Sequence, residues 1–217
     1  YGGITDELTV NYTTIVELAG TGPAFVNDTE ITSWWAGGDK LYIVASDEWL
    51  GARSGWADGE TAAGSVAREV LGIAAEHNDV NYGASGDQQG VSRLFAIEND
   101  PMSGGLYTYL MNANVDSSMD STGAAIQVYL NYDPYYETGG SNWLDGVDAI
   151  ASHTVNMTGL SGVLDSTGAP ATDATEYNVM ISGQTGTGGR SAFLAFDPIA
   201  LNTQIATPHD AGYQWVG

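Results

Sequence analysis

The hydrophobic and polar positions of the first 50 residues follow strand-like and helix-like spacings in turn. Residues 12–18 (YTTIVEL) are mostly β-branched and apolar, which predicts a strand. Residues 28–36 (DTEITSWWA) begin with a candidate N-cap aspartate and place their apolar residues on one side, which predicts a short amphipathic helix. Residues 40–45 (KLYIVA) lie between a glycine pair and a polar segment, which predicts a buried strand.

Residues 60–77 carry the longest helix-like pattern of the chain. Apolar residues recur there at helical spacing, namely Val66, Val70, Ile73 and Ala74. Glu76 falls off this stripe, and two glycines weaken the pattern. We expect His77 to lie in the last turn of this helix, where a cation meets the negative helix end favourably.

The second half of the chain is richer in strand signals. Strands are predicted at 91–98, 124–132, 176–182 and 191–197, with a further short element at 105–113. The last two strands are joined by GQTGTGGR, which predicts a hairpin turn. This turn lacks the Lys-Ser/Thr ending of a phosphate-binding loop, so it does not indicate nucleotide binding.

This order of elements predicts an α/β fold in one domain, residues 1–217. We expect a mainly parallel central sheet formed by the early strands and an antiparallel hairpin at its C-terminal edge. The chain begins at Tyr1 without a charged and apolar leader, so we expect a fragment or module of a larger exported protein. No apolar run approaches the roughly 18 residues of a spanning helix, so no membrane insertion is expected.

The charge balance limits the partners of this chain. It holds 5 Lys and Arg residues against 27 Asp and Glu residues, a formal net charge of −22, and Lys40 is its single lysine. Too few cations are present to neutralise phosphates, which argues against binding to nucleic acids or anionic membranes. Divalent cations, a basic partner or a solvated acidic surface fit this charge better.

Composition also limits the chemistry. The chain has no cysteine, which excludes disulfides, thiolate metal sites and a cysteine nucleophile. It holds 29 Gly, 12 Tyr and 6 Trp residues, a composition typical of loop-rich exported proteins. We therefore expect an extracellular or cell-surface location.

Several segments together resemble a known family. ITSWWAGGDKLYIVASDEW resembles the segment of class I glutamine-amidotransferase-like domains in which a helix and a glycine pair lead into a central strand and a tight elbow. YTTIVELAGTG, GSVAREVLGI, NWLDGVDAI and GTGGRSAFLAFDPIAL are similar to other segments of the degenerate versions found in large secreted bacterial proteins. The resemblance covers about residues 12–77 and 143–201 and implies a flavodoxin-like three-layer sandwich.

The catalytic residues of that family are missing from this chain. Active members carry a cysteine at the elbow and a downstream His-Glu pair. Here the elbow contains Ala45, Ser46 and Asp47, and no histidine stands beside Phe196 and Asp197. The resemblance therefore does not imply amidotransferase activity, and the sequence favours a non-enzymatic role.

A secreted hydrolase acting on glycan or peptide remains an alternative. Its weak catalytic candidates are Ser46, Asp47, Glu48 and His209, with His77 and His153 as other possible bases. The elbow lacks the glycines of G-x-S-x-G, and the histidines at 153 and 209 stand in segments that predict loops. The aromatic loop at 133–146 is the candidate for stacking on sugars, or it covers a surface short of aliphatic side chains.

Calcium is the cofactor that the acidic composition favours. Calcium binds six to eight oxygen ligands from carboxylates, amides and carbonyl groups. The best candidate ligands are Asp133, Glu137, Asp145 and Asp148, although Asp-Pro and Asp-Gly also occur in ordinary turns. We expect these four residues to hold Ca²⁺ if any part of the chain does.

The sequence thus predicts a non-catalytic structural or adhesive module of an extracellular or cell-surface protein. Exposed tryptophan and tyrosine side chains on glycine-rich loops would contact protein partners or further copies of the chain. A subunit of an extracellular filament or surface layer is a related alternative.

Overall fold

A computed structural model describes most of the chain. The described residues are 6–19, 28–46, 48–80, 92–105, 130–132, 144–160, 175–184, 188–198 and 201–202. Within these ranges the helices with described bounds are α1 (Asp6–Asn11), α2 (Asp28–Ala36), α3 (Glu48–Ser54) and α4 (Val66–Glu69). The strands are β1 (Thr14–Leu18), β2 (Leu41–Ala45), β3 (Gly59–Glu60), β4 (Ile73–His77), β5 (Ser92–Ala96), β6 (Leu130–Tyr132), β7 (Gly146–Ala149), β8 (His153–Leu160), β9 (Glu176–Gln184), β10 (Arg190–Leu194) and β11 (Leu201–Asn202).

The main sheet is mixed, with the order β1-β2-β10-β9-β8-β5-β6-β11. Six of these strands have five or more residues, and the short strands β6 and β11 extend one edge. Only β1 with β2 and β2 with β10 pair in parallel, and every other pairing in this sheet is antiparallel. The α/β class is confirmed, whereas the prediction of a mainly parallel sheet is wrong.

The C-terminal hairpin explains this error. Strands β9 and β10 pair antiparallel, as predicted, but β10 also pairs with β2. The hairpin therefore lies in the middle of the sheet and not at its edge. It joins the parallel strands of the N-terminal half to the antiparallel strands that follow.

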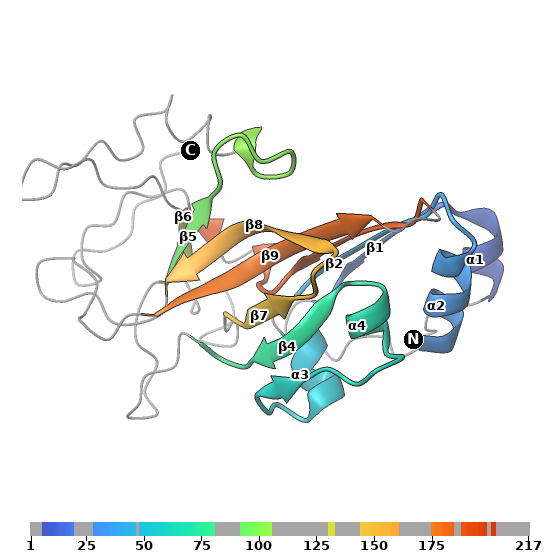
Figure 1. The fold of residues 1–217 in the computed structure, drawn as a ribbon, viewed down its shortest axis with the longest axis horizontal. Coiled ribbons are helices and arrows are strands. Elements are labelled where there is room, and N and C mark those ends of the chain that lie inside the picture. Colours follow the sequence, from blue (N-terminus) through green and yellow to red (C-terminus); the bar gives the residue numbers. More distant parts are fainter. Residues whose placement is uncertain are drawn as a thin grey trace, which may run out of the picture.

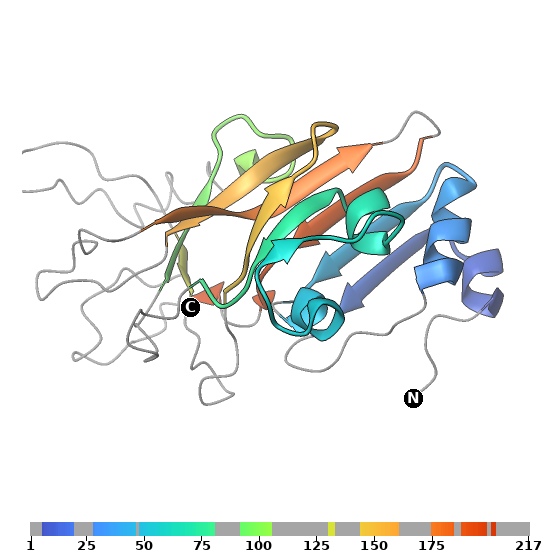
Figure 2. The same ribbon diagram turned by 60° about the horizontal axis from the view of Figure 1, so that its bottom comes forward.

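A second sheet of three antiparallel strands, in the order β3-β4-β7, lies beside the main sheet with α3 and α4 (Figures 1 and 2). One hydrophobic cluster joins helices α2, α3 and α4 to the main sheet. Its aromatic and large aliphatic members include Trp34, Trp35, Tyr42, Trp49, Leu50, Ile181 and Phe193. The predicted third layer on the opposite face of the sheet stays a prediction.

The predicted helix at 60–77 is wrong. Gly64 and Gly72 have φ angles of +83° and +73°, which lie in the left-handed region that ends helices. Only α4, capped by the Ser65 side chain, is helical there, and β4 follows as the central strand of the small sheet. His77 is therefore a strand residue that pairs with Gly146, and it does not cap a helix.

Several other elements predicted from the sequence are found in the structure. The strands near 12–18, 40–45, 91–98, 176–182 and 191–197 and the helix at 28–36 are confirmed, with small shifts of their ends. The segment around His153 is wrong as a loop, because this residue begins β8. The predicted element at 105–113 and the aromatic loop at 133–146 lie mostly outside the described residues.

In the part of the chain that the structure describes, no helix is long and apolar enough to cross a membrane.

Candidate functional site

The elbow after β2 does not present its serine to solvent. Ser46 is fully buried, and its backbone N–H donates a hydrogen bond of 3.1 Å to the carbonyl of Leu194. Glu48 begins α3, and its Oε2 accepts a hydrogen bond of 2.7 Å from Trp56 Nε1. Asp47 lies outside the described residues. A catalytic role for this elbow stays an untested alternative, and the burial of Ser46 disfavours it as a nucleophile.

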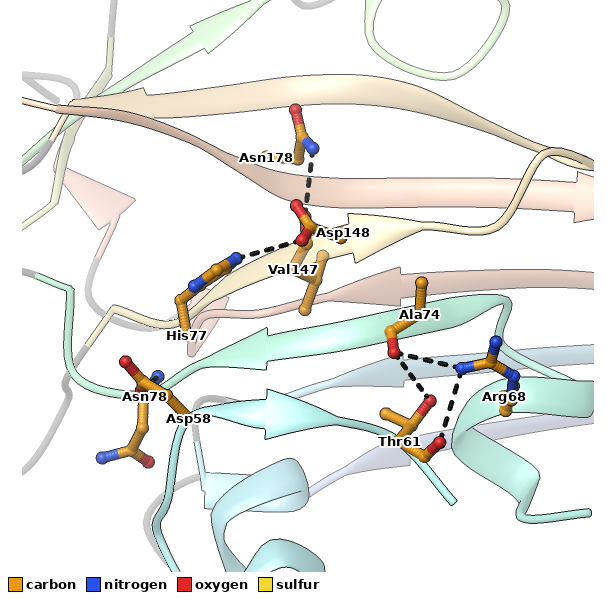
Figure 3. A network of polar contacts seen from close by, with 9 residues as sticks. All are labelled: Asp58, Thr61, Arg68, Ala74, His77, Asn78, Val147, Asp148 and Asn178. Carbon is orange, nitrogen blue, oxygen red and sulfur yellow. Dashed lines mark hydrogen bonds and ion pairs between the residues drawn. The ribbon is translucent and has the colours of Figure 1, made fainter. Parts of the chain in front are cut away.

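The two described histidines make polar contacts elsewhere. His77 Nε2 lies 3.3 Å from Asp148 Oδ2, on the small sheet (Figure 3). His153 Nε2 lies 3.2 Å from Ser191 Oγ, and burial lowers the pKa of this histidine. His209 lies outside the described residues.

The predicted calcium ligands are only partly described. Asp145 is 2% exposed, and its Oδ1 accepts a hydrogen bond of 2.8 Å from the backbone N–H of Asp79. The Asp148 side chain is 57% exposed and pairs with His77. Asp133 and Glu137 lie outside the described residues. Within the described ranges no three His, Asp or Glu side chains are grouped to hold a metal, so the four-residue site stays a prediction.

An open cavity of about 590 Å³ lies between α3, the segment that follows it and β4. Its polar walls carry one arginine, three hydroxyl side chains and four carboxyl side chains. They are Arg53, Ser54, Thr61, Ser65, Asp28, Asp58, Glu60 and Glu76. With all four carboxyl groups ionised, acids outnumber the single cation of this lining.

Glu76 is the most unusual residue of this cavity. It is 2% exposed and stands opposite Val147 in the register of the small sheet. Its Oε1 has no hydrogen-bond partner. Burial raises the pKa of Glu76 to about 7, opposed by a hydrogen bond from Ser54 and assisted by the negative charges of Asp58 and Asp79. The carboxyl group is therefore poised to change charge near neutral pH.

Arg53 is held by contacts at the cavity wall. Its guanidinium lies 3.4 Å from the centre of the Trp49 ring, and its Nη1 donates a hydrogen bond of 3.1 Å to the Trp49 carbonyl. Nη2 lies 3.4 Å from Asp28 Oδ1. These contacts fix the guanidinium over an aromatic ring and pair its charge with a neighbouring carboxylate.

Polar contacts also fix the segment around β3, which lines part of the cavity (Figure 3). Arg68 Nη1 donates to the carbonyl groups of Thr61 and Ala74 at 3.4 and 3.2 Å. At the other end of β4, the backbone N–H of Asn78 donates to Asp58 Oδ1 at 2.8 Å. The segment that carries Asp58 and Thr61 is thus tied to both ends of β4, so the cavity is largely preformed.

A separate surface lies at the β1 edge of the main sheet. Val16 and Leu18 are 54% and 71% exposed, whereas the alternate residue Glu17 is 6% exposed. Tyr12, between α1 and β1, is 57% exposed. In the described ranges β1 pairs with β2 alone. We call Tyr12, Val16 and Leu18 the apolar edge.

Comparison with models of protein families gave no match, and comparison with curated proteins gave none. The resemblance to amidotransferase-like domains therefore stays a prediction.

The cavity was not predicted from the sequence. The helix-like spacing predicts Glu76 off the apolar stripe of a helix, where a glutamate is usually solvated. The segment IAAEH also fits a strand in which Ala74 and Glu76 share a face, and the preceding Gly72 was the signal that favoured this alternative.

Proposed function

We propose that this chain is a non-catalytic structural module of an exported or cell-surface protein and that it associates through its apolar edge. The observation that carries this proposal is the exposure of Val16 and Leu18 on the outermost strand of the main sheet. Edge strands with exposed backbone and apolar side chains pair readily with another strand. A second copy of the chain is the simplest partner.

The pattern of β1 supports this role. Ile15 and Glu17 face the core side of the sheet, since they stand opposite the buried Tyr42 and Val44. Val16 and Leu18 point to the other face and leave large apolar area in water. A protein with a net charge of −22 repels its own copies, so a local apolar contact is needed to hold copies together.

Sedimentation velocity over a concentration series tests this proposal. We expect the wild-type chain to associate as concentration rises and the Val16→Lys/Leu18→Lys variant to remain monomeric. The Thr29→Lys/Ser33→Lys variant is the matched control, because both residues are exposed on α2 and the added charge is the same. A wild-type chain that stays monomeric at the highest reachable concentration contradicts self-association.

Three finer features belong to this proposal. The module retains a third layer, as amidotransferase-like domains do, and this layer covers the opposite face of the main sheet beyond the apolar edge. Calcium bound by Asp133, Glu137, Asp145 and Asp148 stabilises it. Its surroundings are extracellular, where calcium is abundant and the absence of cysteine removes any dependence on redox state.

A further inference from the structure

One oxygen of a buried carboxyl group lacks a partner at the cavity wall. Glu76 is 2% exposed, and its Oε1 makes no hydrogen bond to any residue. Buried carboxylates are normally paired or fully hydrogen-bonded, because an unsatisfied buried polar group destabilises the fold. The hydrogen bond from Ser54 satisfies the group only in part.

The charges around Glu76 determine which ligand fits. Asp58 and Asp79 act on this carboxyl group from the segment before β3 and from the end of β4, and their negative charge disfavours a second anion. Asp28 and Glu60 add two more carboxyl groups to the cavity lining. The one positive side chain of the lining, Arg53, already pairs with Asp28 and stacks on Trp49.

We propose that this cavity binds a primary alkylammonium group, such as the side chain of a lysine in a basic peptide, with Glu76 as its counter-ion. The ammonium supplies the hydrogen bond that Glu76 Oε1 lacks. This proposal goes beyond the association through the apolar edge, because it concerns a different surface and a different ligand.

The walls of the cavity also fit the stem of such a ligand. Small and aliphatic side chains alternate there with the polar ones. They are Leu50, Ala52, Ala57, Ala62 and Ala67. Methylene groups bury favourably against such walls, while the charged head reaches the carboxyl group.

Other cations fit less well. A metal ion needs several oxygen ligands at once, and the described ranges contain no group of three His, Asp or Glu side chains that could hold one. A guanidinium group binds best to two free acceptor oxygens side by side, whereas this carboxyl group already receives a hydrogen bond from Ser54. An ammonium group needs only one such acceptor in addition to hydroxyl or carbonyl oxygens.

Binding should depend on pH. The ionisable groups that act on Glu76 are Asp58, Asp79 and His77. The remaining charged groups of the lining are Asp28, Arg53 and Glu60. An ammonium ion binds the ionised carboxylate, so the affinity should fall roughly tenfold between pH 8 and pH 6 as Glu76 becomes protonated.

The test is a titration of the folded chain with n-butylammonium chloride at constant ionic strength, followed by amide chemical shifts. We expect shifts at residues of α3, β3 and β4, and roughly ten- to a hundred-fold weaker binding for Glu76→Gln. The matched control is Glu60→Gln, which removes one charge from an exposed position of the same cavity. We expect a change within about threefold there. Neutral 1-butanol should bind at least about tenfold more weakly than n-butylammonium.

Several results would overturn the proposal. They are equal binding of 1-butanol and n-butylammonium, equal losses in the two variants, or shifts that map to surfaces away from α3 and β4. The pH series on the wild-type chain needs no variant, so it decides the question even if Glu76→Gln fails to fold. An affinity that stays constant from pH 8 down to pH 4, where a glutamate is largely protonated even at its ordinary pKa, excludes Glu76 as the counter-ion.

Discussion

Two buried glutamates, one on each sheet of this protein, differ in how their carboxyl groups are hydrogen-bonded. Glu17, on β1 of the main sheet, is 6% exposed and accepts a hydrogen bond of 2.5 Å from the Tyr42 hydroxyl. Glu76, on β4 of the small sheet, is 2% exposed and has an oxygen without a partner. Both carboxyl groups are removed from water, but only Glu76 keeps a buried oxygen without a hydrogen-bond partner.

This difference separates a structural carboxyl group from a candidate ligand site. Burial and the nearby Glu17 carboxylate raise the pKa of Tyr42 far above its ordinary value, so its hydroxyl keeps its proton and keeps donating. The Glu17–Tyr42 pair also joins β1 to β2. Glu76 instead lines an open cavity and carries a pKa of about 7, so burial there leaves a group that a ligand can satisfy.

The largest expected effect comes from breaking the satisfied pair. Glu17→Ala removes the Cγ methylene and the carboxyl group and leaves the fully buried Tyr42 hydroxyl without this acceptor. The free energy of unfolding should fall by about 2–4 kcal/mol, measured by urea denaturation at pH 7. Val16→Ala, at the exposed neighbouring position, should change it by less than about 1 kcal/mol. Equal losses in the two variants would show that the Glu17–Tyr42 pair contributes little.

Removing the Glu76 carboxyl group should raise the free energy of unfolding at high pH, which is the opposite of the effect expected for Glu17→Ala. Because the pKa of Glu76 is raised from 4.5 to about 7 by burial, the folded state holds a proton that the unfolded state releases. This contribution to stability is complete below about pH 4.5 and is lost as the pH rises through 7. Glu76→Gln should therefore be more favourable at pH 8 than at pH 5, by about 2–3 kcal/mol relative to wild type.

Denaturation of both chains at several pH values measures this difference. Asp79, whose pKa burial raises to about 6, titrates with the same sign in both chains, so only its coupling to Glu76 contributes to the difference. Parallel stability curves for wild type and Glu76→Gln between pH 5 and pH 8 would contradict a raised pKa.

A smaller effect on stability is expected from calcium, which would neutralise the carboxyl groups that bind it. If Asp145 and Asp148 contribute to a calcium site with Asp133 and Glu137, excess Ca²⁺ should raise the melting temperature by a few degrees, about 2–4 °C per kcal/mol of binding. EDTA should reverse the shift. Magnesium at the same concentration is the control for ionic strength, and identical melting curves in Ca²⁺, Mg²⁺ and EDTA would exclude a stabilising calcium site.

Local patterns predicted the elements around Glu17 but not those around Glu76. The β-branched run of β1 and the apolar run of β2 are strong strand signals, and both strands are confirmed. The antiparallel pairing of β9 and β10 is also confirmed. Their position in the sheet was not predictable, because β10 contacts β2 across about 150 residues of sequence.

The helix-like spacing of residues 60–77 is misleading, because part of this segment forms the central strand of the small sheet. Val66, Val70 and Ile73 suit a helix, yet Gly72 takes a φ of +73° and packs so closely on His153 that a Cβ there would lie 2.2 Å from the ring. Pairing with β7 then makes residues 73–77 a strand and turns Glu76 inward. Such a long-range contact overrides a local period, so the buried carboxyl group became evident only from the fold.

The most direct measurement is the pKa of the Glu76 carboxyl group, read from its ¹³C chemical shift with and without n-butylammonium. The side-chain signal is assigned by its absence in Glu76→Gln. If Glu76 is the buried counter-ion of the cavity, we expect a pKa of about 7 in the free chain and a clear decrease when the ammonium is bound. A pKa near the ordinary value of 4.5, unchanged by the ligand, would contradict this role of Glu76.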